Sequence, residues 1–295
     1  MLKKFYYGGQ AVIEGVMMRG KKTMVTAVRR PDGGLVTDTQ PLPAIYTGRM
    51  RQAPFIRGII VLIEALVLGF KALIYSANVS LEEEGEKVSG WLVWAIMAVA
   101  LVFAVALFFM APLFLTRLLN ISSSLLFNLV DGLIRVAIFI AYLTVMALMP
   151  DIRRVFAYHG AEHKAVNAYE AGIPLEVETV KAYSTAHVRC GTSFLFMVLI
   201  ISIVVFSLIG LHSLWLMVLS RVILIPVIAA LSYEVIYFGA RHINNGLIKA
   251  TMVPGLWLQA LTTREPDDSQ LEVALLALKG VVAADQADEA PQLSS

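Results

Sequence analysis

The sequence predicts a mainly α-helical membrane protein with about four transmembrane helices, one interfacial or re-entrant helix, and a small cytosolic β module at the N-terminus. The composition is the first reason, because 58% of the 295 residues are hydrophobic, 16% are charged and the mean hydropathy is +0.73. A soluble globular protein has about 45–50% apolar and about 25% charged residues. The second reason is that the apolar residues form long uninterrupted runs, and the third is a β-rich start of the chain.

Four runs are long enough for a transmembrane helix, which needs about 20 apolar residues. They cover residues 91–116, 127–149, 194–210 and 216–238. Asp131 and Arg135 lie inside the second run, four residues apart, so a helix would let them form an ion pair. Pro226 is expected to kink the fourth helix.

A fifth apolar stretch covers residues 55–76, but Glu64 and Lys71 interrupt it. Its uncharged part is only about half as long as a transmembrane helix. We therefore expect an interfacial or re-entrant helix here.

Basic residues predict the orientation, because cytoplasmic segments of membrane proteins are rich in Lys and Arg. Residues 1–90 carry twelve of the 24 Lys and Arg residues, and residues 151–193 carry five more. Both termini and this middle segment are therefore expected in the cytoplasm of a multi-pass cell-membrane protein.

The N-terminal segment has the composition of a small sheet. Residues 10–19, 23–30 and 35–39 are expected to form three strands, with a hairpin turn at residues 31–34. Glu14 and Arg19 would then point to opposite sides of the first strand, because their separation is odd. Near the C-terminus, residues 271–282 have the spacing of an amphipathic helix.

These predictions divide the chain into seven segments. They are a β module (1–50), a membrane-associated helix with an acidic linker (51–90), two transmembrane helices (91–149), a cytosolic loop (150–193), two further transmembrane helices (194–240), a cytosolic segment with the amphipathic helix (241–282) and a disordered tail (283–295).

Several classes of protein are excluded. The net charge of +2 and the absence of a basic block argue against nucleic-acid binding. The single cysteine, Cys190, excludes an internal disulfide. No apolar run precedes Glu14, so no cleavable signal peptide is expected. The lipid bilayer is the expected partner, and association into a homo-oligomer is left open.

The chemistry is concentrated in one motif of the middle segment. On a helix, His159 and His163 would project from one face, where two imidazoles can chelate a divalent metal ion, most often zinc. Glu162 completes an H-x-x-E-H pattern, the inverted form of a zinc-protease signature. In such sites the glutamate does not bind the metal but takes a proton from the attacking water.

Two further residues strengthen this interpretation. His187 and Cys190 have a His-x-x-Cys spacing that also suits chelation, and they stand just before the third transmembrane run. If all four side chains bind, the site is closed and structural; if only three bind, a position stays open for catalysis. The alternative is that these residues are ordinary interfacial histidines and a structural thiol.

Three residues are candidates for orienting the metal ligands. Glu170 lies seven positions after His163 on the same helical face, and Arg189 lies next to Cys190. Glu14 on the first strand could point onto the site as well.

Four blocks of the sequence resemble the signature of one bacterial family. They are residues 8–19, 159–164, 189–194 and 254–266. The family consists of uncharacterised multi-pass membrane proteins described as predicted metal-dependent enzymes. The resemblance covers nearly the whole chain and implies a metal-dependent membrane enzyme, without a substrate.

Three hypotheses for function follow. The first is a metal-dependent, hydrolytic membrane enzyme with zinc at the cytosolic face and Glu162 as the general base. The second is a non-catalytic scaffold or assembly factor with a structural metal site. The third, a metal or ion transporter, ranks last because it needs polar residues through several transmembrane helices, and Asp131, Arg135 and Glu234 are too few.

Overall fold

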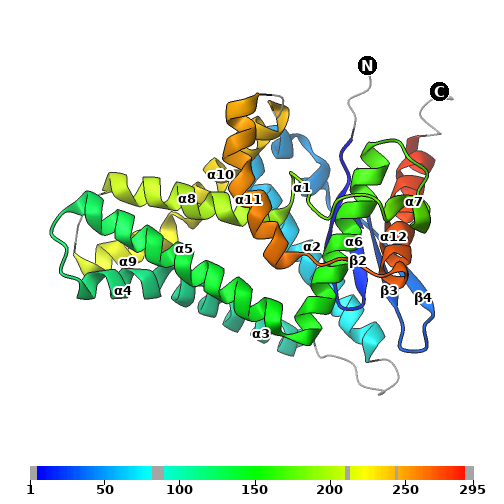
Figure 1. Cartoon of the computed structure of the whole chain (residues 1–295), viewed down its shortest axis with the longest axis horizontal. Coiled ribbons are helices and arrows are strands. Elements are labelled where there is room, and N and C mark those ends of the chain that lie inside the picture. Colours follow the sequence, from blue (N-terminus) through cyan, green and yellow to red (C-terminus); the bar gives the residue numbers. More distant parts are fainter. Residues whose placement is uncertain (1–4, 82–89, 210–212, 243–244, 290–295) are drawn as a thin grey trace.

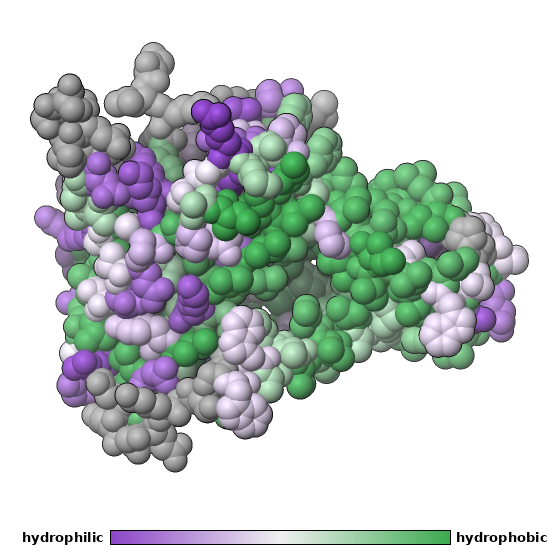
Figure 2. Space-filling view, turned by 180° about the vertical axis from the view of Figure 1, so that it is seen from behind, coloured by the Kyte–Doolittle hydropathy of each residue, from purple (hydrophilic) through white to green (hydrophobic). Residues whose placement is uncertain are grey.

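A computed structural model describes residues 5–81, 90–209, 213–242 and 245–289. The molecule has two parts (Figure 1): a compact part that contains the sheet and helix α12 (Asp268–Glu289), and an elongated layer of helices that extends away from it. Figure 2 shows that the surface of the compact part mixes polar and apolar residues, whereas the elongated part is almost uniformly apolar.

The N-terminal sheet has four antiparallel strands in the order β1-β2-β3-β4. They are Gly8–Val12, Gly15–Arg19, Thr23–Arg29 and Leu35–Pro41. The prediction of three strands was wrong, because residues 10–19 are not one strand. A tight turn at Ile13 and Glu14 divides them, and Glu14 has a left-handed backbone with φ of 50°. Glu14 therefore lies in a turn and not opposite Arg19 on a strand.

Each face of the sheet packs against helices, as the alternation of side chains in a strand dictates. Met18 and Val25 face helices α6 (Pro150–Glu170) and α12 (Asp268–Glu289) in the main core of the compact part. Met17 and Met24 face the opposite way, onto helix α2 (Ile56–Ser80).

The remaining elements are short connecting helices and the apolar helices of the elongated part. The short ones are α1 (Ala44–Thr47), a 3-10 turn (Arg49–Gln52) and α7 (Val177–Val180). The apolar ones are α3 (Gly90–Val105), a π-helical turn (Ala106–Met110), α4 (Ala111–Leu118), α5 (Ser124–Leu148), α8 (Gly191–Ile209), α9 (Leu214–Ile223) and α10 (Ile225–Arg241). Helix α11 (Gly246–Thr262) leads back to the compact part.

Four of the described helices are long and apolar enough to cross a membrane: Ile56–Ser80, Trp94–Leu118, Ser124–Leu148 and Gly191–Ile209. A fifth span is possible if α9 and α10 count as one helix, bent by 48° at their junction. The bend lies next to Pro226, so the predicted kink is confirmed.

The structure differs from three other predicted segment boundaries. Helix α2 has 25 residues, long enough for a complete span, and so exceeds the half-span expected from its charges. The segment expected as a cytosolic loop contains the 21-residue helix α6, which is central to the core. Helix α12 continues to Glu289, into the segment expected to be disordered. The acidic linker and the end of the tail lie outside the described residues.

Candidate metal centre

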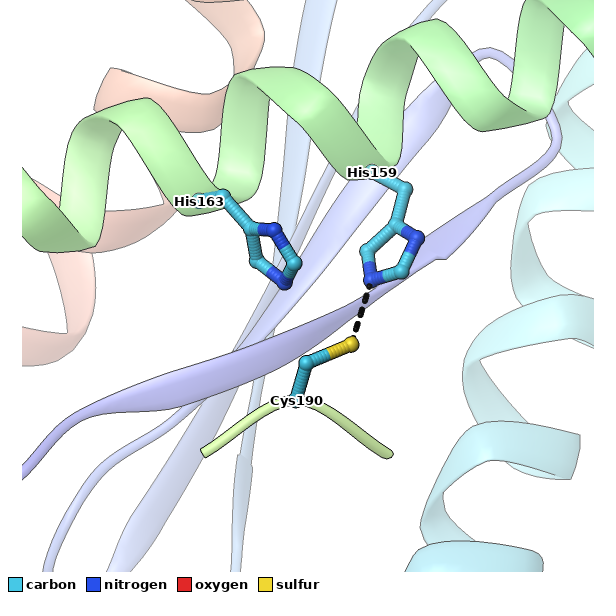
Figure 3. Close-up of side chains that lie close together, drawn as sticks. All are labelled: His159, His163 and Cys190. Carbon is cyan, nitrogen blue, oxygen red and sulfur yellow. Dashed lines mark hydrogen bonds between the residues drawn. The ribbon is translucent and has the colours of Figure 1, made fainter. Parts of the chain in front are cut away.

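Three side chains converge at the place where α6 meets the start of α8. His159 and His163 project from one face of α6, and Cys190 stands immediately before α8 (Figure 3). One ligand atom from each lies within 4.8 Å of the other two. The Sγ of Cys190 is 3.3 Å from Nε2 of His159. The helical spacing thus brings the two predicted histidines to the predicted cysteine.

Main-chain carbonyl groups orient both imidazoles. Nδ1 of His159 is 2.8 Å from the carbonyl oxygen of Thr262, and Nδ1 of His163 is 2.5 Å from that of Thr185. A carbonyl can only accept, so each Nδ1 carries the proton and donates it. In the neutral imidazole with this tautomer, Nε2 carries the lone pair with which histidine binds a metal.

The main chain at the start of α8 holds the thiol of Cys190 in place. Its Sγ accepts a hydrogen bond from the main-chain N–H of Thr192, 3.4 Å away. This N–H belongs to the first turn of α8, where unpaired N–H groups and the helix dipole stabilise negative charge.

Gly160 explains how α6 can approach the segment that follows α11. A Cβ atom at this position would lie 2.1 Å from the carbonyl oxygen of Arg264, a contact that no side chain permits. The main-chain N–H of Arg264 in turn donates to the carbonyl oxygen of Phe156, 2.9 Å away. The glycine beside His159 therefore allows the carbonyl of Thr262 to reach its imidazole.

Glu162 is buried beside the three ligands. Its Oε1 accepts a hydrogen bond of 2.9 Å from the main-chain N–H of Gly9 on β1. Its Oε2 lies 3.4 Å from Nε2 of His163. The carboxylate thus reaches the ligand atom of His163 but is not one of the three atoms that lie mutually closest.

His187 is close to this group but does not belong to it. Its ring centre is 5.6 Å from that of His163. Gln259 on α11 holds the main chain of His187 at both ends, accepting from its N–H at 2.9 Å and donating to its carbonyl at 2.7 Å. Burial lowers the pKa of His187 below its ordinary value, although the charge of Glu162 opposes the shift.

Glu170 and Arg189 form an ion pair on the far side of His187. Oε2 of Glu170 is 3.8 Å from Nε2 of His187, and the guanidinium of Arg189 lies 4.1 Å from the ring centre of Tyr6. Burial lowers the pKa of Arg189, and Tyr6 opposes the shift. Glu170 and Arg189 therefore lie beside His187 and do not contact the group of His159, His163 and Cys190.

Glu14 does not reach the group. It pairs with Arg154 on the first half of α6 and accepts a hydrogen bond of 3.2 Å from the hydroxyl of Tyr158. Burial raises the pKa of Tyr158, and the charge of Glu14 adds to this effect. Glu14 thus anchors the turn between β1 and β2 to α6.

Sequence reasoning missed Gln259 and the carbonyl groups of Thr185 and Thr262. Backbone carbonyls leave no signal in the residue types. Gln259 lies within the C-terminal block that resembles the family signature, and this was the available signal.

The donor set fits a divalent metal. Two neutral imidazoles and one thiolate are preferred zinc ligands, and three protein ligands are typical of a site with an open position. The carbonyl partners on both Nδ1 atoms are the outer contacts that such ligands usually have.

Comparison with known proteins places the chain in a family. A family model described as "Protein of unknown function (DUF1385)" matches residues 53–284. The chain belongs to this family. It is also 38% identical over 287 residues to the "Uncharacterized protein YqhQ" of Bacillus subtilis (strain 168), covering 91% of this chain and 90% of that protein.

No solved structure matches the chain. The family and the relative are described without an activity, a metal or a ligand. The bacterial relative and the uncharacterised family agree with the resemblance seen in the sequence. These matches do not support the description of that family as metal-dependent enzymes.

Proposed function

We propose that this protein is a metal-dependent hydrolase of the cell membrane that holds one zinc ion at its cytosolic face. The observation that carries the proposal is the group of His159, His163 and Cys190, whose ligand atoms lie within 4.8 Å of one another. A carbonyl holds Nδ1 of each imidazole, so Nε2 is the ring nitrogen left to bind the metal. A zinc ion held by these three atoms would supply a Lewis acid that makes water acidic enough to react at neutral pH.

Glu162 is the residue that would move the proton. Its Oε1 is fixed by the N–H of Gly9, while Oε2 faces His163 at the edge of the three ligands. A general base needs a free oxygen that is held within reach of the water from which it takes a proton. The bond to Gly9 restricts the rotation of the carboxylate and leaves Oε2 for this role.

The surface of the elongated part supports a membrane location. Side chains such as Val99, Val102 and Leu133 are more than 65% exposed on helices that have almost no polar surface. Trp91 and Trp94 begin α3 and Trp215 begins α9, and all three are exposed. Tryptophans at helix ends are typical of the two membrane interfaces.

Helix α2 is long enough to span, but its packing favours an interfacial position. The sheet covers it through Ile60, Leu68 and Ala72, which are buried against strand residues. Glu64 on the same face accepts hydrogen bonds from Arg19 and Arg51. A sheet with exposed strand edges belongs outside the hydrocarbon core, so the part of α2 beneath it is placed at the membrane surface.

The scaffold hypothesis has one supporting observation. His187 is buried, and its ring lies 5.6 Å from that of His163, so a rotation of its side chain could bring a fourth nitrogen to the group. Four protein ligands would close the site and make the metal structural.

The deciding experiment combines metal analysis with one isosteric variant. Full-length protein purified gently is expected to contain about one zinc per chain, and His159→Ala or His163→Ala to remove it. Glu162→Gln is expected to keep the zinc but to lose about a hundredfold or more of function, measured by complementation of a deletion strain.

Two results would contradict the proposal. Metal-free wild-type protein whose thermal stability does not respond to added zinc would exclude the metal site. Full complementation by Glu162→Gln would exclude hydrolysis with Glu162 as base and leave a structural metal.

A further inference from the structure

A second polar cluster lies within the apolar helices, far from the three metal ligands. It contains Asp131 and Arg135 on α5, Arg221 on α9 and Ser202 on α8, all buried, with exposed fractions of 2% or less. Ser202 lies about 16 Å along α8 from its first residue, Gly191. The cluster is therefore separate from the candidate metal centre.

The charges in this cluster do not balance. Arg135 donates to Oδ2 of Asp131 and to Oγ of Ser202, both at 2.5 Å. Arg221 approaches the same carboxylate from another helix, with its terminal nitrogen 3.3 Å from Oδ1. Two guanidinium groups thus share one carboxylate, which leaves one positive charge in excess.

Several N–H groups of these arginines are unused. Nε of Arg135 and Nε of Arg221 are buried without a hydrogen-bond partner among the described residues, whereas Nη2 of Arg221 and Oδ1 of Asp131, which also lack one, face each other at 3.3 Å. The ring of Phe206 lies close to both guanidinium groups, with its centre 5.1 Å from Arg135 and 4.6 Å from Arg221. Burying a charged donor without an acceptor is strongly unfavourable, so such groups indicate a missing partner.

The cluster also lies beside a break in the helical backbone. Arg221 is in the last turn of α9, just before the 48° bend that leads into α10. Discontinuous helices at membrane depth commonly line binding sites, and ionisable residues within apolar helices commonly contact a ligand.

We propose that Arg135 and Arg221 bind a phosphate-type oxyanion between α5, α8 and α9. An oxyanion carries the negative charge and the acceptor oxygens that the cluster lacks, and guanidinium groups bind phosphate through paired N–H donors. The source is either the headgroup of an anionic phospholipid or free phosphate, which share this chemistry.

The test uses the full-length protein in neutral detergent. One arm titrates short-chain phosphatidylglycerol against phosphatidylcholine, and the other titrates inorganic phosphate against chloride at equal ionic strength. Thermal unfolding and native mass spectrometry report binding. The wild-type protein is expected to be stabilised saturably at one ligand per chain. A response to the lipid alone identifies a headgroup, and a response to both identifies the free oxyanion as sufficient.

Two variants locate the site. Arg221→Met removes the excess charge with little change in volume and is expected to weaken binding about tenfold to a hundredfold, as for lost hydrogen bonds to a charged group. Arg153→Met is the matched control, because Arg153 is an exposed arginine on α6. The affinity of this variant for the lipid or phosphate is expected to stay within about twofold of wild type. If Arg221→Met does not fold, Arg221→Lys replaces it and is expected to bind about tenfold more weakly, since it lacks the planar guanidinium.

Three results would overturn the proposal. The first is a wild-type protein that responds to neither phosphatidylglycerol nor phosphate. The second is unchanged binding in the Arg221 variant that folds. The third is an equal loss in Arg153→Met, which would assign binding to the general surface charge.

Discussion

The carboxylate of Glu162 accepts a hydrogen bond from the main-chain N–H of Gly9, 2.9 Å away, and so joins helix α6 to strand β1 across 153 positions of the chain. Gly9 itself has no room for a side chain, because a Cβ atom would lie 2.2 Å from the carbonyl oxygen of Met17. The strand can therefore present this N–H to Glu162 only if the residue is glycine.

Gly9→Ala is expected to lower the free energy of unfolding by about 1–3 kcal/mol, because the strand must shift away from Met17. Denaturant unfolding measures this change. Gly8→Ala is the control, since a Cβ at Gly8 would meet nothing within 4 Å; it is expected to change stability by less than about 0.5 kcal/mol. Equal effects of the two variants would show that the contact between β1 and α6 is not tight.

His187→Ala is expected to retain the metal, because the ligand atoms of His159, His163 and Cys190 form the close group without His187. The metal content of the folded, purified variant is the measurement, with His159→Ala as the variant that loses it. Metal lost from His187→Ala would mean that four residues close the site, which favours the structural role.

Glu64→Gln is expected to destabilise the protein by about 2 kcal/mol, because two arginines lose their common partner at the contact between the sheet and α2. The estimate is below that for a fully buried pair, since Arg51 is 28% exposed. The control is Glu272→Gln, which changes a carboxylate that is 55% exposed and pairs with Arg29; it is expected to cost less than about 0.5 kcal/mol. An effect of Glu64→Gln no larger than the control would argue against tight docking of the sheet on α2.

The predicted orientation is tested with two introduced cysteines. Cys190 is buried, so the wild-type protein is expected to give little labelling by an impermeant maleimide. Ser122→Cys, in the exposed connection between α4 and α5, is expected to be labelled in intact cells. Asp32→Cys, in the exposed turn between β3 and β4, is expected to be labelled only in inverted vesicles. The opposite pattern would place the candidate metal centre outside the cell.

Most of the correct sequence predictions depend on regular spacing. Runs of apolar residues located the long helices, because a membrane-length helix needs little beyond continuous hydrophobicity. The four-residue spacing of His159 and His163 predicted their common face, because 3.6 residues complete one helical turn. The prediction of one strand over residues 10–19 was wrong because of Glu14. A non-glycine residue with positive φ forms a turn here, and the composition does not signal such a turn.

By itself, then, the sequence determined the apolar helices, the kink at Pro226 and the two histidines on one helical face, because each follows from local spacing or from one residue's backbone chemistry. Only the tertiary structure decided which residues meet across the chain. It brings Cys190 to His159, Gly9 to Glu162, and Arg221 to Asp131, while Glu14 goes to Arg154. These contacts depend on how the sheet, α6, α8 and the bent helix pack against one another, and packing between distant segments leaves no periodic signal in the sequence.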